Sequence, residues 1–314
     1  MKEIADIIRE WKSHRGQPLA LATLVRAQGS SYRRPGARML ICADGTNAGS
    51  LSGGCLEEEV ARRAFEVLRT GTPSLMSFDT RLRFGCNGTI EIFLETVREG
   101  FLADLAKELG NRRSCRAVTV FAGAAGEMGT RILPPGEKEP AGAFVQEIQP
   151  PIQLLIFGDG PDSTPLRSFA EILGWRVLEV EQAFDLPGHA DQRTAAVVKS
   201  HNYGRDFAAL QHLLQIDNLR YVGLLGPRKR RDQLVGALLD AGVSIEAELF
   251  APAGFDLGAE TPEEIALAII SEIQTVFAEA SGESLRDRKA SIHGWNLVRA
   301  PGPRQVEKCA TLAP

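Results

Sequence analysis

Short apolar runs separated by turn signals fill the first part of the chain, a pattern typical of strands joined by tight connections. The apolar runs at 19–27 and 37–43 are separated by a loop rich in hydroxyl groups. Asp44-Gly45 then separates the second run from a short return strand, and Asp-Gly between apolar runs is a strong hairpin signal. A further alternating run covers 89–97. Together with helical spacing farther along, these runs predict a mixed α/β domain.

Helical spacing of apolar residues begins at Cys55 and stops at Gly71, so a helix is predicted there. The loop before it contains Gly53 and Gly54, whose backbone freedom lets a ligand approach the main chain closely. Cys55 would lie among the unpaired N–H groups of the first turn, which together with the helix dipole favour the thiolate. Glutamates at 57–59 oppose ionisation of that thiol. A small buried residue that closes a turn is the alternative interpretation.

Two further loops carry side chains that suit an anionic or metal-containing ligand. Arg33 and Arg34 lie in the loop between the first two strands. A guanidinium group can donate two parallel hydrogen bonds to one phosphate or carboxylate, although a merely solvated arginine pair is the alternative. The segment 85–88 holds a second thiol, Cys86, beside Asn87. These residues are therefore candidate ligand contacts.

The second part of the chain alternates strand and helix patterns, which is typical of a parallel sheet with helices packed on it. The predicted strands are 152–157, 176–180, 195–199 and 221–225, and the predicted helices include 205–214 and 228–239. The last helix begins with a capping box at Thr261 and a proline at its first position. The predicted class is a Rossmann-like, doubly wound α/β domain, in which ligands bind beyond the carboxyl ends of the strands.

The loop after the first of these strands matches a dinucleotide fingerprint only in part. Gly158 and Gly160 match its first two glycines, but Ser163 replaces the third. Asp159 and Asp162 put carboxylates where a pyrophosphate would rest, and Asp162 is expected to cap the following helix. The sheet is therefore expected to keep the fold with a different ligand, and binding of NAD(P) is the alternative.

Three more groups are predicted at the same edge of the sheet. His201 and Asn202 follow the strand 195–199, Pro227 and Arg228 follow 221–225, and Glu260 precedes the last helix. His201 is the only histidine at the carboxyl end of a predicted strand, so it could act as an acid or base or contact a ligand. The alternative interpretation is a structural histidine whose hydrogen bonds stabilise a turn. The other histidines are expected to be incidental, and they are His14, His189, His212 and His293.

Composition excludes several classes of function. A chain of 314 residues with 44% hydrophobic content is long enough for two cores, so two domains are expected. The formal net charge of −4 provides no basic field for nucleic acid or a membrane surface. No apolar run approaches the ~20 residues that span a bilayer, and the N-terminus does not resemble a signal peptide. The 5 cysteines are irregularly spaced, which favours reduced thiols in the cytoplasm and predicts no built-in zinc site.

Prolines mark the predicted domain boundary. The segment 134–140 is expected to close the first domain, and Pro150-Pro151 precedes the first strand of the second. The predicted domains are therefore 1–148 and 149–281. The remaining residues, 282–314, are expected to form an extension that is draped on the surface or disordered.

These loops belong to a longer series of motifs in both domains. In the first domain they are Gly-Ser-Ser-Tyr-Arg-Arg-Pro-Gly-Ala-Arg-Met at 29–39, Gly-Ser-Leu-Ser-Gly-Gly-Cys-Leu-Glu at 49–57 and Gly-Cys-Asn-Gly at 85–88. In the second they are Leu-Leu-Ile-Phe-Gly-Asp-Gly at 154–160, Ser-His-Asn-Tyr-Gly-Arg-Asp at 200–206, Tyr-Val-Gly-Leu-Leu-Gly-Pro-Arg at 221–228 and Gly-Ala-Glu-Thr-Pro-Glu-Glu-Ile-Ala at 258–266. This series, spanning about residues 15 to 280, resembles the XdhC/CoxI family.

The members of that family are accessory proteins for molybdenum hydroxylases such as xanthine dehydrogenase. The resemblance therefore implies a maturation factor, not an enzyme, that binds the molybdenum cofactor, protects it and passes it to the apoenzyme. In this interpretation Arg33 and Arg34 hold the pterin phosphate, and the amides of Gly53 and Gly54 approach the ligand. Cys55 would hold or guard the metal-dithiolene end as a thiolate.

The resemblance also suggests a cysteine desulfurase as a partner, with Cys55 or Cys86 relaying sulfur or the chain acting only as a docking scaffold. An NAD(P)-dependent oxidoreductase is the alternative from another class. A homodimer is expected.

The ligand is expected in one cleft between the domains, with Cys55 and Cys86 on one wall and Gly160, His201 and Arg228 on the other. Two independent surfaces are the alternative arrangement.

Overall fold

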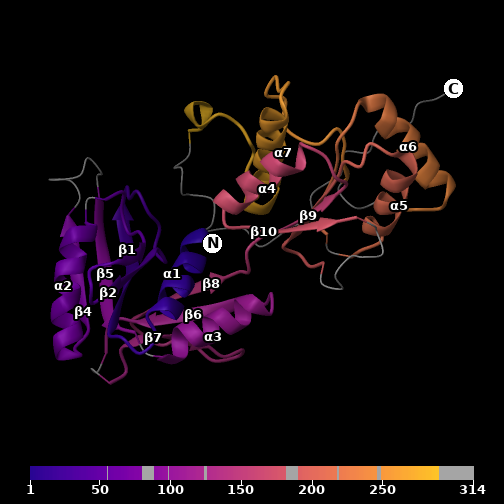
Figure 1. Cartoon of the computed structure of the whole chain (residues 1–314). Helices are drawn as coiled ribbons and strands as arrows, with labels where there is room; N and C mark the ends of the chain where they lie inside the picture. Colours follow the sequence, from indigo (N-terminus) through magenta and orange to yellow (C-terminus); the bar gives the residue numbers. More distant parts are fainter. Residues whose placement is uncertain are drawn as a thin grey trace. The chain divides into compact units, whose positions relative to one another are not determined.

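The computed structural model describes residues 1–54, 56–79, 88–97, 99–123, 126–181, 190–217, 219–245 and 249–289 of the chain (Figure 1). Residues Met1–Ala280 form one compact unit and Ser281–Pro314 form another. The second unit contains one 3₁₀ turn, η2 (Leu285–Asp287), among its described residues.

The first sheet of the larger unit is antiparallel and has the strand order β3-β2-β1-β5-β4. Its strands are β1 (Leu19–Gly29), β2 (Arg38–Cys42), β3 (Asn47–Gly49), β4 (Ser74–Asp79) and β5 (Gly88–Thr96). β2 and β3 form the hairpin predicted at Asp44-Gly45, where Gly45 has a φ of 91°. The four strands predicted in this part of the chain are confirmed as β1, β2, β3 and β5, whereas β4 was not predicted.

Both faces of this sheet are covered, because successive side chains of the central strand point to opposite sides. The face that carries Ala20 packs under α2 (Glu57–Thr70). The face that carries Leu21 packs under α1 (Lys2–Ser13) and α3 (Glu99–Gly110). The buried central strand therefore has an apolar core on each side.

A second, three-stranded antiparallel sheet has the order β7-β6-β8. Its strands are β6 (Cys115–Val120), β7 (Gly129–Leu133) and β8 (Ala143–Ile148). The sequence patterns did not predict this sheet. The proline-rich segment 134–140 connects β7 to β8, so another strand follows it before Pro150-Pro151.

The third sheet is parallel and has the order β10-β9-β11-β12-β13. Its strands are β9 (Gln153–Phe157), β10 (Arg176–Val180), β11 (Thr194–Val198), β12 (Tyr221–Leu224) and β13 (Leu249–Phe250). The four strands predicted from apolar runs are confirmed, and β13 adds a short edge strand.

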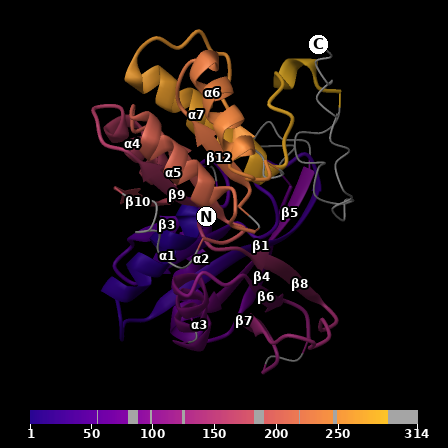
Figure 2. The ribbon, with the colours of Figure 1, turned by 90° about the vertical axis from the view of Figure 1, so that its right-hand side faces the viewer.

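Helices cover both faces of the parallel sheet, and Figure 2 shows α4 to α7 grouped around its strands. α4 (Ser163–Ile172) and α7 (Pro262–Ala278) pack on one face. α5 (Tyr203–Leu213) and α6 (Arg228–Asp240) pack on the other. The predicted doubly wound α/β class is confirmed, and so is the capping box at Thr261.

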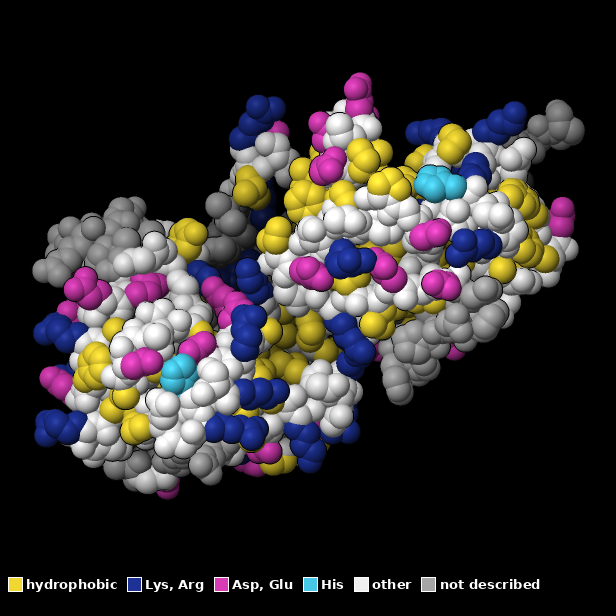
Figure 3. Space-filling model, in the orientation of Figure 1, with side chains coloured by type: hydrophobic (Ala, Val, Ile, Leu, Met, Phe, Trp, Pro, Cys, Tyr) yellow, Lys and Arg dark blue, Asp and Glu magenta, His cyan; other side chains and the backbone are white. Residues whose placement is uncertain are grey.

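Acidic and basic side chains are interspersed over the face of the molecule shown in Figure 3. Among the described residues, no helix is both long enough and apolar enough to cross a membrane.

Candidate functional site

The loop that leads from β3 into α2 is organised around one carboxylate, that of Glu57. Its Oε1 accepts hydrogen bonds from Ser50 Oγ (2.8 Å), Leu51 N (3.1 Å) and Ser52 N (2.8 Å). Its Oε2 accepts from Ser52 Oγ (2.5 Å), Gly54 N (3.1 Å) and Leu56 N (3.1 Å). The helix begins at Glu57, two residues after the predicted start. We call residues 50–57 the Glu57 loop.

These hydrogen bonds keep the carboxylate ionised. Partial burial acts to raise the pKa of Glu57, but the hydrogen bonds from Ser52, Ser50 and the backbone outweigh burial and lower this pKa to about 2. A fixed negative charge therefore lies at the start of α2, where the helix dipole favours it.

The two glycines of the loop differ in what surrounds them. Gly54 has a φ of 112°, which favours glycine, and its N–H already donates to Glu57. A Cβ atom at Gly53 would lie 3.6 Å from the ring of Tyr32, whose side chain is largely exposed. The loop therefore packs beside an aromatic ring from the arginine-containing loop.

The two arginines of the predicted pair differ in the structure. Arg33 donates from Nη1 to Oε1 of Glu3 in α1 (2.7 Å) and from Nη2 to Oε2 of the same carboxylate, and this hydrogen bonding raises the pKa of Arg33. Arg34 is the more exposed of the two. The other predicted contacts of this domain, Cys55, Cys86 and Asn87, lie outside the described residues, so their roles stay predictions.

A second group of predicted residues meets at the carboxyl edge of the parallel sheet. β9, β11 and β12 are neighbours, so the loops that follow them lie side by side. Gly158 and Gly160 follow β9, His201 follows β11 and Arg228 begins α6 after β12. The structure thus places these four residues at one edge, and their contact with a ligand stays a prediction.

Gly158 is required by a close crossing of two backbones. Its φ is 105°, and a Cβ atom there would lie 2.5 Å from Cα of Ser200. His201 has a φ of 54°, which is uncommon for a residue with a side chain, and its ring is 68% exposed. Its Nε2 lies 3.9 Å from Oδ2 of Asp162.

A buried lysine that the sequence reasoning missed occupies the glycine loop. The side chain of Lys199 is fully buried, and its Nζ donates to Asp162 Oδ1 (2.8 Å) and to the backbone oxygen of Asp159 (3.1 Å). Asp162 stands at the N-cap of α4 but makes no side-chain cap bond, so the expectation that it caps this helix is wrong. The carboxylate is instead bound to the ammonium group of Lys199.

A second buried ion pair lies beside the first, and its members were not predicted either. Asp206 is fully buried, accepts from Ser200 N (3.0 Å) and pairs with Arg230 of α6 (2.5 Å). Asn202 caps α5 by accepting from Arg205 N (3.1 Å). The sequence signal for Lys199 was a single charged residue directly after the apolar run 195–198. These pairs give the edge a fixed, charged framework.

The two halves of the chain together define a class of protein: an antiparallel α/β domain with a Gly-Gly-Cys segment joined in one chain to a doubly wound domain. The sequence matches the XdhC and CoxI family over residues 13–79 and the XdhC Rossmann domain over 154–273. The chain therefore belongs to the XdhC/CoxI family.

Known relatives cover most of the chain. It is 30% identical to a Bacillus subtilis protein described as a probable subunit of xanthine dehydrogenase, in a match that covers 81% of this chain and 91% of that protein. It is 26% identical to the molybdenum cofactor insertion chaperone PaoD of Escherichia coli, covering 83% of this chain and 84% of PaoD. A crystal structure described as a xanthine dehydrogenase from Bacillus halodurans has a TM-score of 0.74 at 26% identity, covering 91% and 98% of the two chains.

Proposed function

We propose that this protein assists the maturation of a molybdenum hydroxylase of the xanthine dehydrogenase type by binding the molybdenum cofactor and passing it to the apoenzyme. The observation that carries the proposal is the likeness, along most of both chains, to a molybdenum cofactor insertion chaperone. The Bacillus subtilis relative, whose description names xanthine dehydrogenase, supports the same class of client enzyme.

The Glu57 loop supports Cys55 as the residue that meets the metal end of the cofactor. The N–H groups of Gly54 and Leu56 both donate to Oε2 of Glu57. The backbone is therefore held by hydrogen bonds on each side of residue 55. A thiolate is a soft ligand and suits a metal that is already bound by sulfur.

Positive charge for the phosphate end would come from Arg33 and Arg34, of which Arg34 is the more exposed. Arg33 is bound by both nitrogens to the carboxylate of Glu3, so its use as a ligand contact requires that this pair be broken. We expect Arg33→Ala and Arg34→Ala each to weaken binding of the cofactor.

Retention of the cofactor on gel filtration tests the proposal. The wild-type chain should carry the cofactor through the column, and Cys55→Ala and Arg34→Ala should lose most of it. Cys115→Ala, which removes a buried thiol, and Arg62→Ala, which removes an exposed arginine of α2, are matched controls that should keep it. No retention by the wild type would refute the function. Equal retention by all variants would refute the assigned residues.

Sulfuration of the bound cofactor is the finer part of the proposal, with a cysteine desulfurase as the donor. The Cys55 or Cys86 thiolate would attack the outer sulfur of the desulfurase persulfide, and the desulfurase thiolate would leave as the sulfur–sulfur bond breaks. Incubation with the desulfurase and cysteine, followed by intact mass measurement, should show a persulfide on one of these thiols. A chain without that mass increment would be a scaffold and not a relay.

An NAD(P)-dependent oxidoreductase is the second candidate, and the doubly wound sheet with Gly158 and Gly160 favours it. The exposed carboxylate of Asp159 opposes it, because this group puts negative charge at the loop that would receive a pyrophosphate, and the ammonium group of Lys199 is already paired with Asp162. Calorimetry with NAD(H) and NADP(H) separates the two functions. Micromolar binding would favour the oxidoreductase, and no binding at millimolar concentration would exclude it.

We also propose that the protein forms a homodimer, because two-fold association is the commonest state of soluble oligomers. Light scattering at micromolar concentration should give twice the chain mass of 34.1 kDa. A single species at the chain mass would contradict the dimer.

A further inference from the structure

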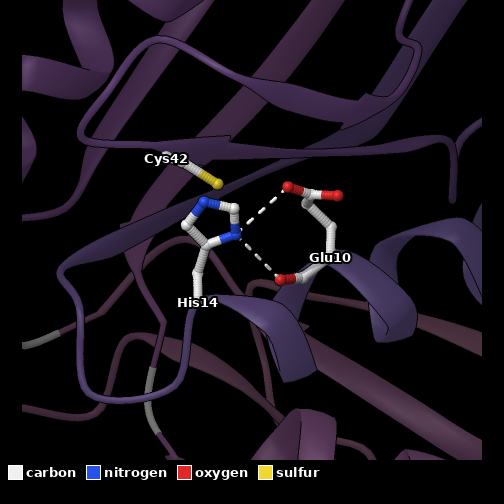
Figure 4. A group of neighbouring side chains, drawn as sticks. All are labelled: Glu10, His14 and Cys42. Atoms are coloured by element: carbon white, nitrogen blue, oxygen red, sulfur yellow. Dashed lines mark hydrogen bonds and ion pairs between the residues drawn. The ribbon is translucent and has the colours of Figure 1, made fainter.

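Four side chains with metal-ligating atoms converge where α1 meets the β2–β3 hairpin. Glu10 lies in the last turns of α1, His14 follows that helix, Cys42 ends β2 and Asp44 lies in the turn of the hairpin. One donor atom each from Glu10, His14 and Cys42 lie within 4.8 Å of one another. Figure 4 shows these three side chains pointing toward one another.

The imidazole ring is held between two carboxylates. Its Nδ1 lies 3.1 Å from Oε1 of Glu10 and 3.2 Å from the backbone oxygen of the same residue. Its Nε2 lies 3.4 Å from Oδ2 of Asp44. Asp44 is fixed in turn, because its Oδ1 accepts from Thr46 N (2.9 Å) and Thr46 Oγ1 (2.7 Å). The ring therefore presents both nitrogens to anionic oxygen atoms.

The electrostatics of this place favour a cation. Among the described residues, His14 is the only ion-pair partner of Glu10 and of Asp44. The neighbouring carboxylates of α1 differ, since Glu3 pairs with Arg33 and Asp6 pairs with Arg9. The C-terminal end of a helix also carries partial negative charge on its last carbonyl groups. Two carboxylates and a helix terminus thus surround a thiol, and no lysine or arginine in the described part of the chain pairs with them.

An ion has a route to this place from solvent. The Cys42 side chain is fully buried, but the His14 side chain is 16% exposed and those of Glu10 and Asp44 are 30% and 51% exposed. The sulfur atom thus lies at the inner end of the cluster and the carboxylates at its outer end.

We propose that Glu10, His14 and Cys42 form a binding site for one divalent cation of the zinc type, with Asp44 orienting the imidazole ring through its other nitrogen. Thiolate sulfur, imidazole nitrogen and carboxylate oxygen are the ligands that zinc uses, and its bonds of ~2.0–2.3 Å place tetrahedral donors roughly 3.5 Å apart. Only short side-chain movements separate the present arrangement from that geometry. When the sulfur becomes a ligand, the Cys42 thiol loses its proton to solvent.

Sequence spacing did not indicate this site, because its residues come from two segments about 30 positions apart, 10–14 and 42–44, and neither holds a Cys-x-x-Cys or paired-histidine motif. The site would join α1 to the hairpin whose second strand, β3, continues directly into the Glu57 loop. The bound ion would therefore stabilise the strand that leads into that loop, whether or not the loop binds a cofactor.

Metal titration of the full chain after chelator treatment tests the site. Calorimetry should show one Zn²⁺ bound per chain, and Co²⁺ should give a sulfur-to-metal charge-transfer band in the near ultraviolet. Cys42→Ser should abolish that band, and His14→Gln should abolish tight binding. Asp44→Asn should weaken the affinity by about 10–100-fold, the usual effect of removing a group that orients a ligating histidine, and Glu10→Gln, which removes a ligand, should weaken it at least as much.

Control variants test whether the charge-transfer band comes from Cys42 and not from another cysteine, and whether tight binding comes from His14 and not from surface carboxylates. Cys115→Ser removes a second buried cysteine, and Cys55→Ser, Cys86→Ser and Cys309→Ser remove the rest; all four variants should keep the band. Circular dichroism checks that each variant is folded. If Cys42→Ser does not fold, the Zn²⁺ affinity of His14→Gln tests the proposal instead. A band that survives Cys42→Ser, or Zn²⁺ affinity unchanged in His14→Gln, would overturn the proposal.

Discussion

Replacing Glu57 with glutamine should destabilise the protein by an amount that depends on pH. The carboxylate accepts hydrogen bonds from four backbone N–H groups of the loop and from two serine hydroxyl groups. An amide of the same shape keeps one acceptor oxygen and presents an NH₂ group to the remaining donors. The N–H groups that then lack an acceptor are the source of the cost.

The magnitude follows from the pKa. Its change from 4.5 to about 2 corresponds to roughly 3 kcal/mol in favour of the ionised form. Because the group is partly exposed, solvent screening reduces this value, and we expect a loss of about 1–2 kcal/mol in the free energy of unfolding near neutral pH. For a domain of ordinary size that loss lowers the melting temperature by roughly 2–8 °C.

The sign of the pH dependence is fixed, because the folded-state pKa lies below the unfolded value. The stabilisation is fully present above pH 4.5 and disappears as the pH falls toward about 2. Urea unfolding of the wild type and of Glu57→Gln should therefore give curves that converge across this window. Glu58→Gln, at the exposed neighbouring position, is the control and should behave like the wild type.

Equal stability of Glu57→Gln and the wild type near neutral pH would refute the reasoning. A constant difference at all pH values would refute it as well, because the difference would then not come from ionisation. If the Glu57 loop presents Cys55 to the cofactor, the same variant should also retain less cofactor on gel filtration.

Two further predictions concern the carboxyl edge of the parallel sheet. Asp162→Ala leaves the buried ammonium of Lys199 without its carboxylate and should cost about 3–5 kcal/mol in urea unfolding. Adding Lys199→Met should recover part of this loss, whereas strictly additive costs would show that the pair is not coupled. Gly158→Ala puts a Cβ atom 2.5 Å from Cα of Ser200 and should cost about 1–3 kcal/mol. Gly236→Ala, in helix α6 with nothing within 4 Å, should instead stabilise by about 0.5–1 kcal/mol, and equal effects of the two changes would contradict the close crossing at Gly158.

Several features were predictable because their signals lie in neighbouring residues. The hairpin at Asp44-Gly45 and the end of α2 at Gly71 each depend on a glycine with positive φ, 91° and 68° respectively. The capping box at Thr261 is likewise a contact between residues three positions apart. The alternation of strand and helix patterns also predicted the doubly wound class, because neighbouring parallel strands are usually connected by a crossover that contains a helix.

Part of the candidate site followed from the same reasoning. The carboxyl ends of parallel strands share one edge, so Gly158, Gly160, His201 and Arg228 were expected together and lie together. Their neighbours were not predictable. Whether Asp162 caps its helix or binds an ammonium group depends on Lys199, which lies 37 residues farther along.

Tertiary structure alone decided such long-range pairings. The ion pair of Arg33 depends on Glu3, which lies in helix α1 and not in the loop that carries the arginine. The cluster of Glu10, His14 and Cys42 depends on where the end of α1 meets the hairpin. The physical reason is that helical spacing and turn angles are local properties of the chain, whereas the partner of a charged side chain is set by which elements the buried apolar faces bring together.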